Sequence, residues 1–475
     1  MQKKSLRGVK SLIRSVEGIF EIAVLTILYY VVWRRGYDSA SLPGYLGYGK
    51  FVLCGIYAML MMVLFFGLDG FKFGYLRNSD VLISQLIAVF ITNFITYWQL
   101  CLIAEAVISP APMVLLMVMG AVVTLICTTS YSALYHRLYT PKNMAMVLGR
   151  DAAVTLKFKM DTRPDKYNVV KLIPAEDPLD EICAQIKKYD AVIINDVPSQ
   201  VRNDILKYCY QNKIRTYVTP KITDIVIRGA EAINLFDTPL LLVKGMGLTP
   251  SQRIVKRAMD LILCLIAMVL AAPIMLLVAL AIKLEDHGPV FYKQARVTLD
   301  GKVFDILKFR SMIVDAEKEG HSIPATGKDP RITKVGRLIR ACRVDELPQL
   351  LNIIKGDMSI VGPRPERVEH MEKYGEEVPE FILRTKVKGG LTGYAQIYGK
   401  YNTSPYDKVR LDLMYIENYS IMLDIKLILR TIRILFSKES TEGFETIQEN
   451  EQKKEEILEQ LHKERESVTT GTDAQ

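Results

Sequence analysis

Residues that build disulfide frameworks and zinc centres are scarce in this chain. Its 475 residues include seven cysteines and five histidines, and neither a CxxC nor an HExxH pattern occurs. Four of the cysteines lie in apolar runs, which indicates small buried side chains. We therefore expect neither a disulfide framework nor a zinc site.

A glycine-rich phosphate-binding loop is also missing. Residues 143–245 alternate short apolar runs with helical-looking segments, which predicts a Rossmann-like α/β domain with a parallel sheet over residues 141–248. Its first predicted strand ends at a lone Gly149, and no GxGxxG occurs there. Without that fingerprint, a scaffold or docking role is favoured over dinucleotide binding.

Apolar residues are abundant, at 50% of the chain. Runs at residues 19–33, 51–68, 81–108 and 113–128 are long enough, or nearly so, to cross a hydrocarbon core of about 30 Å. They predict a bundle of four transmembrane helices over residues 1–140. The basic residues before the first run place the N-terminus in the cytosol by the positive-inside rule. The net charge of +9 suits nucleic acid, anionic lipid or phosphorylated substrates without choosing among them.

A fifth apolar run, residues 261–282, has basic residues on both sides and Pro273 in its middle. Proline removes a backbone hydrogen bond and favours a kink. The run either crosses the membrane as a kinked helix or enters, breaks at Ala272-Pro273 and returns. Its residues alone do not decide between these two topologies.

Two adjacent carboxylates, Asp345 and Glu346, begin the stretch DELPQLLNII. One interpretation is structural: Asp345 caps an apolar helix and Glu346 occupies its first turn. The other is an acidic active site. An ionised aspartate can attack phosphorus, and Mg²⁺ would suit a pair of carboxylates facing phosphate oxygens.

Basic residues near this dyad favour the active site. Lys308, Arg310, Arg340 and Arg364 are cations of the type that bind phosphate, and a simple helix cap does not need them. Arg364 stands between two prolines, which limit the freedom of its backbone.

Residues 250–436 resemble the bacterial polyprenyl-phosphate phosphoglycosyl transferases of the monotopic type, also called sugar transferases. The resemblance rests on six ordered blocks: RIVKRAMDLILCLIAMVLAAP, GPVFYKQARV, FDILKFRSM, LIRACRVDELPQLLNIIKGDMSIVGPRPE, KGGLTGYAQIYGK and YDKVRLDLMYIENYSIMLDIK. The segments before residue 250 resemble the long-chain members of this family.

The resemblance implies a mainly helical catalytic domain at residues 249–438 with a re-entrant membrane helix at about 258–283, followed by a charged, partly disordered tail at 439–475. The expected reaction transfers sugar 1-phosphate from a UDP-sugar to undecaprenyl phosphate and releases UMP. Asp345 is expected to be the nucleophile and Glu346 a base or metal ligand, with Mg²⁺ on both. The expected substrate-binding residues are Lys308, Arg310, Arg340, Arg364, Arg296 and Lys400.

The resemblance also implies a location and partners. We expect a multi-pass protein of the bacterial inner membrane with its catalytic domain in the cytosol. Membrane lipid and a second copy of the chain are expected partners, and nucleic acid is not. The chain departs from the family where Gly389 replaces a usual proline and Lys400 a usual arginine. A non-catalytic scaffold and a transferase that releases UDP are the alternative functions.

Overall fold

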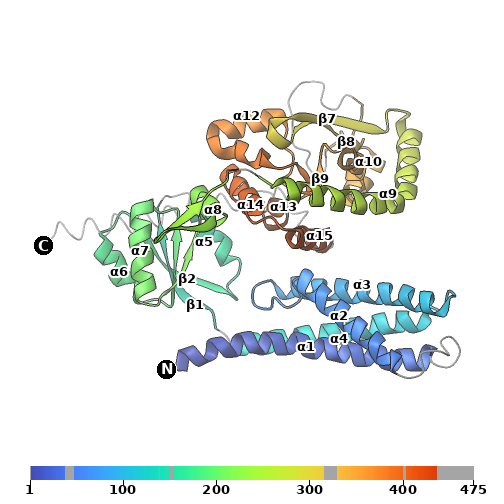
Figure 1. Cartoon of the computed structure of the whole chain (residues 1–475), viewed down its shortest axis with the longest axis horizontal. Coiled ribbons are helices and arrows are strands. Elements are labelled where there is room, and N and C mark those ends of the chain that lie inside the picture. Colours follow the sequence, from blue (N-terminus) through green and yellow to red (C-terminus); the bar gives the residue numbers. More distant parts are fainter. Residues whose placement is uncertain are drawn as a thin grey trace. The chain divides into compact units, whose positions relative to one another are not determined.

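The computed structural model describes residues 2–37, 48–138, 140–149, 154–245, 247–314, 329–399 and 403–435, and the chain forms two compact units (Figure 1). Among the described residues, the first unit comprises residues up to Thr219 together with residues 432–435, and the second runs from Pro220 to Thr431. The N-terminal apolar helices and the parallel sheet belong to the first unit. The described candidate site residues all belong to the second.

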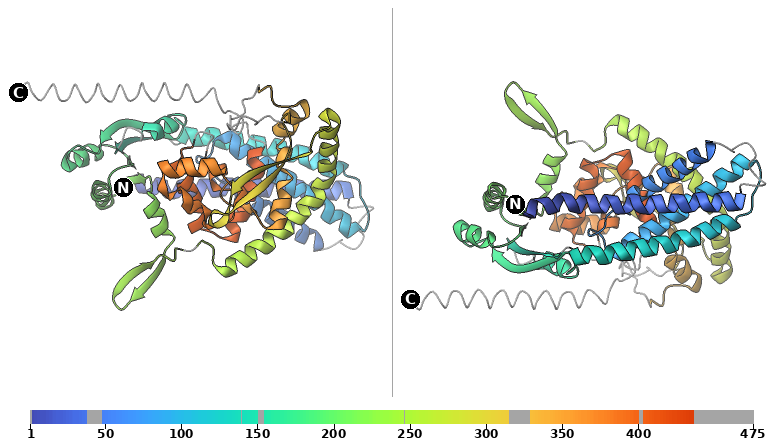
Figure 2. Two further views of the ribbon diagram at one scale, coloured as in Figure 1. Left: turned by 90° about the horizontal axis from the view of Figure 1, so that it is seen from above. Right: turned by 90° about the horizontal axis from the view of Figure 1, so that it is seen from below.

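Four long helices open the first unit: α1 (Gln2–Tyr37), α2 (Gly49–Gly67), α3 (Asn78–Ala104) and α4 (Ala111–Leu138). Both α1 and α3 pack against α2 and α4, and the four run alongside one another (Figures 1 and 2). Each contains a stretch long and apolar enough to cross a membrane, and α9 of the second unit is a fifth such helix in the described part of the chain. These helices are the mark of a membrane protein.

Polar side chains link these helices in their interior. The Gln85 amide donates a hydrogen bond to Glu21 Oε2 at 2.9 Å, and the Thr128 hydroxyl donates to Gln85 Oε1 at 2.6 Å. Glu21 and Gln85 are fully buried. Because lipid supplies no hydrophobic drive between helices, such interhelical hydrogen bonds help to hold them together.

A parallel sheet with the strand order β2-β1-β3-β4 follows the helices. Its elements are β1 (Lys142–Leu148), α5 (Val154–Asp161), β2 (Tyr167–Pro174), α6 (Leu179–Ile186), β3 (Ala191–Asn195), α7 (Ser199–Gln211) and β4 (Arg215–Val218). All of β3 and most of β1 are buried, which is why these strands are continuous apolar runs in the sequence. The predicted central parallel sheet is confirmed.

Gly149 at the end of β1 has a packing role. A Cβ atom at this position would lie 1.9 Å from the Asp196 carbonyl oxygen. Only glycine permits this close approach of the two backbone segments that follow β1 and β3.

The second unit is mainly helical. Its helices are α8 (Ile222–Arg228), α9 (Pro250–Asp286), α10 (Lys334–Ala341), α11 (Gln349–Lys355), α12 (Val368–Glu377), α13 (Tyr394–Tyr398), α14 (Pro405–Glu417) and α15 (Ile421–Leu435). Three strand pairs accompany them: antiparallel β5 (Glu231–Leu235) with β6 (Thr238–Leu242), antiparallel β7 (Phe291–Val297) with β8 (Val303–Phe309), and parallel β9 (Ser359–Val361) with β10 (Gly390–Thr392).

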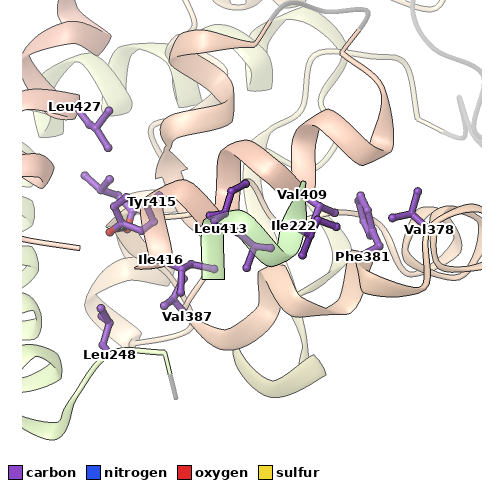
Figure 3. Packing of buried hydrophobic residues seen from close by; sticks show 12 residues of the cluster. Ile222, Leu248, Val378, Phe381, Val387, Val409, Leu413, Tyr415, Ile416 and Leu427 are labelled. Carbon is purple, nitrogen blue, oxygen red and sulfur yellow. Dashed lines mark hydrogen bonds between the residues drawn. The ribbon is translucent and has the colours of Figure 1, made fainter. Parts of the chain in front are cut away.

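One core of this unit joins α8 to α14 and to the 3₁₀ helix η4 (Pro379–Lys386). Ile222 of α8 lies beside Val409 and Leu413 of α14 (Figure 3). Phe381 of η4 is fully buried in the same cluster. The α8 helix therefore packs into the core of the second unit.

The long helix α9 lies against this unit along both of its halves and changes direction between them (Figure 1). It begins at a capping box, in which Thr249 and Gln252 exchange hydrogen bonds. Pro273 lies inside the helix, and proline is the usual cause of a sharp bend. Large apolar side chains such as Val269, Leu270 and Leu276 are at least 70% exposed. They give α9 an apolar surface of the kind that contacts lipid.

Candidate active site

The dyad lies in a single 3₁₀ turn, η3 (Val344–Glu346), between α10 and α11. The turn begins after Arg343, whose φ of 54° is left-handed. The N-cap position of α11 is Pro348, and no side chain caps that helix. Asp345 therefore does not have the structural role of capping α11, and its position needs another explanation.

Glu346 lies between two cations. Lys308 Nζ from β8 and Arg364 Nη2 lie 3.0 Å and 2.8 Å from the same oxygen, Glu346 Oε1. Burial alone would raise the pKa of Glu346, but Arg364 and Lys308 outweigh it and hold the pKa well below its usual range. Glu346 is therefore ionised at neutral pH, with Oε1 bound to both cations.

Asp345 has the opposite electrostatic environment. Burial and the adjacent Glu346 charge raise the pKa of Asp345, and Lys308 and Arg340 oppose them only in part. In the described part of the chain, no ion pair to Asp345 occurs. The dyad thus combines one carboxylate held by two cations with one that has no ion pair in the described residues.

The loop that carries Arg364 is fixed through its carbonyl groups. The backbone N–H groups of Gly390 and Val297 donate to the carbonyls of Pro363 and Glu366 at 2.9 Å and 3.0 Å. Arg296 Nη1 donates to the Pro365 carbonyl at 3.0 Å. Burial, together with the charge of Arg364, lowers the pKa of Arg296 to about 10. Arg296 therefore supports the Arg364 loop at the edge of the site.

One predicted substrate-binding residue, Arg310, lies away from the dyad. Arg310 has a side chain only 7% exposed, forms an ion pair with Asp286 and donates to the Pro289 carbonyl at 2.7 Å. In this structure it ties the end of α9 to β8 and does not contact Glu346. Lys400 lies outside the described residues. The predicted break, Ala272-Pro273, lies within the continuous helix α9.

Sequence reasoning missed a second group of charged residues beneath the Arg364 loop. Arg384 of η4 is buried, with Nε 2.9 Å from Asp412 Oδ2 and Nη1 3.3 Å from Glu366 Oε1. Arg384 Nη2 also donates to the Arg364 carbonyl at 3.1 Å. A possible signal in the sequence was Glu366, which directly follows the GPRP segment.

The dyad fits the way in which Mg²⁺ is usually held. In the described residues, no group of three or more His, Cys, Asp or Glu side chains could hold a metal. Magnesium, however, commonly takes only one or two carboxylates and completes its shell with water and substrate phosphate. Asp345 and Glu346 would be those two carboxylates, and Mg²⁺ binding stays a prediction.

Comparison with known proteins places the chain in a family. The bacterial sugar transferase profile matches residues 251–438. A UDP-glucose:undecaprenyl-phosphate glucose-1-phosphate transferase of Caulobacter vibrioides is 40% identical over 191 residues, which are 39% of this chain and 71% of the relative. The protein of that name from Escherichia coli is 42% identical over 211 residues, 43% of this chain and 44% of the relative.

A third relative differs in the sugar that it is named for. This UDP-N-acetylgalactosamine-undecaprenyl-phosphate N-acetylgalactosaminephosphotransferase of Aeromonas hydrophila is 34% identical over 256 residues, 53% of this chain and 60% of the relative. The chain spans about half the length of several curated relatives that it matches. It belongs to the bacterial sugar transferase family.

Proposed function

We propose that the chain transfers sugar 1-phosphate from a UDP-sugar to undecaprenyl phosphate, giving undecaprenyl-diphosphate-sugar and UMP. The asymmetry of the dyad carries this proposal: Glu346 is held by Lys308 and Arg364, whereas Asp345 has no ion pair in the described residues. The names of the relatives support a UDP-sugar donor and an undecaprenyl-phosphate acceptor. Because those names differ in the sugar, the donor sugar is left open.

The reaction proceeds in two displacements. A carboxylate oxygen of Asp345 attacks the phosphorus that bears the sugar, and the bond to the second phosphate breaks to release UMP. A phosphate oxygen of undecaprenyl phosphate then attacks the same phosphorus. The aspartyl oxygen leaves, and Asp345 is restored as a free carboxylate.

The cations around the dyad bind and orient the phosphates. Arg364 is 39% exposed, so part of its guanidinium faces solvent while Nη2 contacts Glu346. Lys308 is 19% exposed and adds a second positive charge beside the reacting carboxylate. Fixed positive charge of this kind stabilises the negative charge that develops on the transferred phosphoryl group. When bound to Asp345 and Glu346, Mg²⁺ would reduce their repulsion of the pyrophosphate.

The contacts of α9 support a re-entrant helix. A straight helix of 37 residues would be about 55 Å long and would leave its two ends far apart. Instead, Lys256 near its start contacts Asp424 and Asp286 at its end contacts Arg310, so both ends lie on one compact unit. This favours a helix that enters and leaves the same membrane face. We place the catalytic unit in the cytosol, where nucleotide sugars are made, with the four N-terminal helices crossing the bacterial inner membrane.

The product would begin the assembly of an exopolysaccharide, capsule or O-antigen on its lipid carrier. A non-catalytic membrane scaffold and a transferase that moves the sugar without its phosphate are the competing functions. A homodimer and a docking role for the α/β domain stay predictions.

The test is nucleotide release by the purified protein with Mg²⁺, undecaprenyl phosphate and a panel of UDP-sugars. We expect UMP from at least one sugar, and a loss of roughly a thousandfold or more in Asp345→Asn. UDP in place of UMP would identify simple glycosyl transfer. No nucleotide from any sugar would favour the scaffold, and near-normal turnover of Asp345→Asn would exclude Asp345 as the nucleophile.

A further inference from the structure

The carbonyls of Arg364 and Pro365 accept from arginine side chains, Arg384 and Arg296, whereas the carbonyls on either side of them accept from the backbone. Pro363 and Glu366 are held by backbone N–H groups, which the fold supplies. Arg364 is held by the side chain of Arg384, whose Nη2 lies 3.1 Å from the carbonyl oxygen. Because prolines flank Arg364 and have no N–H group, the loop cannot donate backbone hydrogen bonds at these two positions, and its carbonyl contacts are the more important.

Arg384 is itself rigidly held. Its side chain is 4% exposed, and two carboxylates with little exposure of their own, Asp412 at 1% and Glu366 at 11%, lie against it. Asp412 Oδ2 accepts from Nε at 2.9 Å and lies 2.8 Å from Nη2. The guanidinium carbon also lies 4.8 Å from the ring centroid of Phe381. A planar guanidinium can make all these contacts at once, which the single ammonium of lysine cannot.

Glu366 links this buried group to the loop a second time. Burial alone would raise the pKa of Glu366, but Arg384 and Lys408 outweigh it and lower the pKa to about 2. Glu366 is therefore a fixed negative charge two residues after Arg364, bound by Arg384 at 3.3 Å. Arg384 thus holds the loop at the carbonyl of Arg364 and at the side chain of Glu366.

We propose that Arg384 is a positioning residue that fixes the Arg364 guanidinium against Glu346, and through it the phosphate-binding geometry of the site. The proposal rests on the proposed function for its effect on turnover. Its structural part, the control of Arg364 by Arg384, does not depend on which reaction the protein catalyses.

A double-mutant cycle tests the effect on turnover. Arg384→Lys keeps the buried charge but loses the forked contact, and we expect kcat/KM to fall by about 10²-fold, as misplacement by about 1 Å can cause. Arg364→Lys should fall at least as far. If Arg384 acts through Arg364, the double variant should stay within about twofold of Arg364→Lys. Losses that multiply in the double variant, or no loss in Arg384→Lys, would overturn the proposal.

Lys408→Gln is the matched control. Lys408 Nζ lies 3.4 Å from Glu366 Oε1 and is 27% exposed, but no hydrogen bond from it to the Arg364 carbonyl occurs in the described residues. We expect its kcat/KM to stay within about threefold of the unsubstituted protein, because Arg384 still pairs with Glu366 and still donates to the Arg364 carbonyl. A fall as large as that of Arg384→Lys would show that the charge of Glu366, and not the Arg364 carbonyl, is what matters.

A second readout does not require turnover. Phenylglyoxal modifies accessible guanidinium groups, and peptide mass spectrometry gives the rate at Arg364. Without substrate, we expect Arg384→Lys to raise this rate several-fold, because a loosened Arg364 leaves Glu346. An unchanged rate in the folded variant would overturn the proposal even if the protein were active.

Arg384→Lys could fail to fold, because it disturbs a buried ion pair. Asp412→Asn then serves instead. It weakens the ion pair that holds the Arg384 guanidinium and keeps the size of the side chain at position 412. We expect a smaller loss, a few-fold in kcat/KM, and a faster reaction of Arg364 with phenylglyoxal. If neither quantity changes in folded Asp412→Asn, the proposal is wrong.

Discussion

Arg364 donates through Nη2 to Glu346 Oε1 at 2.8 Å, across 18 residues of sequence. This contact brings the GPRP loop onto the acidic turn and assigns the two adjacent carboxylates different environments. Glu346 is compensated by cations, and Asp345 is partly buried beside a like charge. The difference between the two carboxylates supports the assignment of Asp345 as the nucleophile.

The raised pKa of Asp345 predicts an acid limit for activity. Only the ionised carboxylate attacks, so kcat/KM should fall as the pH decreases through that pKa, at a higher pH than for an ordinary aspartate near 3.9. Glu346→Gln removes the like charge and frees two cations, so the acid limb of its residual activity should move to lower pH. A profile of kcat/KM against pH, recorded for the unsubstituted protein and for Glu346→Gln, measures both effects. An acid limb at the same pH in the two proteins would contradict the influence of Glu346 on the pKa of Asp345.

The raised pKa of Asp345 also predicts that this carboxylate lowers the free energy of unfolding at neutral pH. A carboxyl whose folded pKa is raised binds more protons folded than unfolded, so its stabilising contribution is lost as pH rises through that pKa. Asp345→Asn should therefore raise Tm at neutral pH and have little effect below about pH 3.9, where Asp345 is protonated in both states. Thermal unfolding in detergent at both pH values tests this. A lower Tm at neutral pH would show that Asp345 stabilises the fold.

The candidate site was predictable to the extent that it follows from local sequence. Asp345 and Glu346 are adjacent, and Arg364 stands in a conspicuous GPRP segment. The partner of Arg310 was not predictable, because Asp286 lies on a different element and was unremarkable as a helix end. Arg384 was missed because it lies in a segment without a distinctive pattern, and only tertiary packing shows that it is buried. The short β9–β10 pair has strands of three residues, too short for a periodic pattern.

Gly389 is predicted to matter because of its contacts with the Arg364 loop. Its N–H donates to the Thr298 hydroxyl at 3.0 Å, and a Cβ atom there would lie 2.5 Å from Pro365 Cγ. Gly389→Ala should push Pro365 and lower kcat/KM by roughly tenfold. Gly389→Pro introduces the residue that is usual in the sugar transferase family. It should lower kcat/KM further than Gly389→Ala does, because proline also lacks the N–H group that donates to Thr298.

Thr298→Val is the control for Gly389. It removes the hydroxyl, which accepts from Gly389 and donates to the Asp357 carbonyl at 3.0 Å, without adding volume against Pro365. Its kcat/KM should stay within about threefold of the unsubstituted protein if steric pressure on the loop is the main effect. Equal activity in Gly389→Ala and the unsubstituted protein would mean that the loop adjusts freely.

The buried pair of Lys256 and Asp424 is predicted to stabilise the docking of α9. Lys256 Nζ lies 2.6 Å from Asp424 Oδ2, their side chains are 7% and 0% exposed, and the Tyr415 hydroxyl donates to Asp424 Oδ1 at 2.8 Å. Asp424→Asn leaves a buried ammonium without its counter-charge, which typically costs about 3–5 kcal/mol. Thermal unfolding in detergent should show a clear fall in Tm.

The double variant Lys256→Met/Asp424→Asn separates the charge from the packing. Because it removes both charges, it should recover much of the Tm that Asp424→Asn loses. No recovery would mean that the loss in Asp424→Asn comes from the altered contacts of Asp424, such as the hydrogen bond from Tyr415, and not from the unpaired charge of Lys256.

The re-entrant topology of α9 can be tested with thiols on either side of the helix. Cys342 follows α9 and is exposed, and Ser251 at its start is also exposed. A membrane-impermeant maleimide should label Cys342 in inverted membrane vesicles and not in intact spheroplasts. Ser251→Cys in a Cys342→Ser background should behave in the same way, with Cys342→Ser alone as the blank. Labelling of the two thiols from opposite sides would show that α9 crosses the membrane, and the catalytic unit would then lie away from the cytosolic supply of nucleotide sugars.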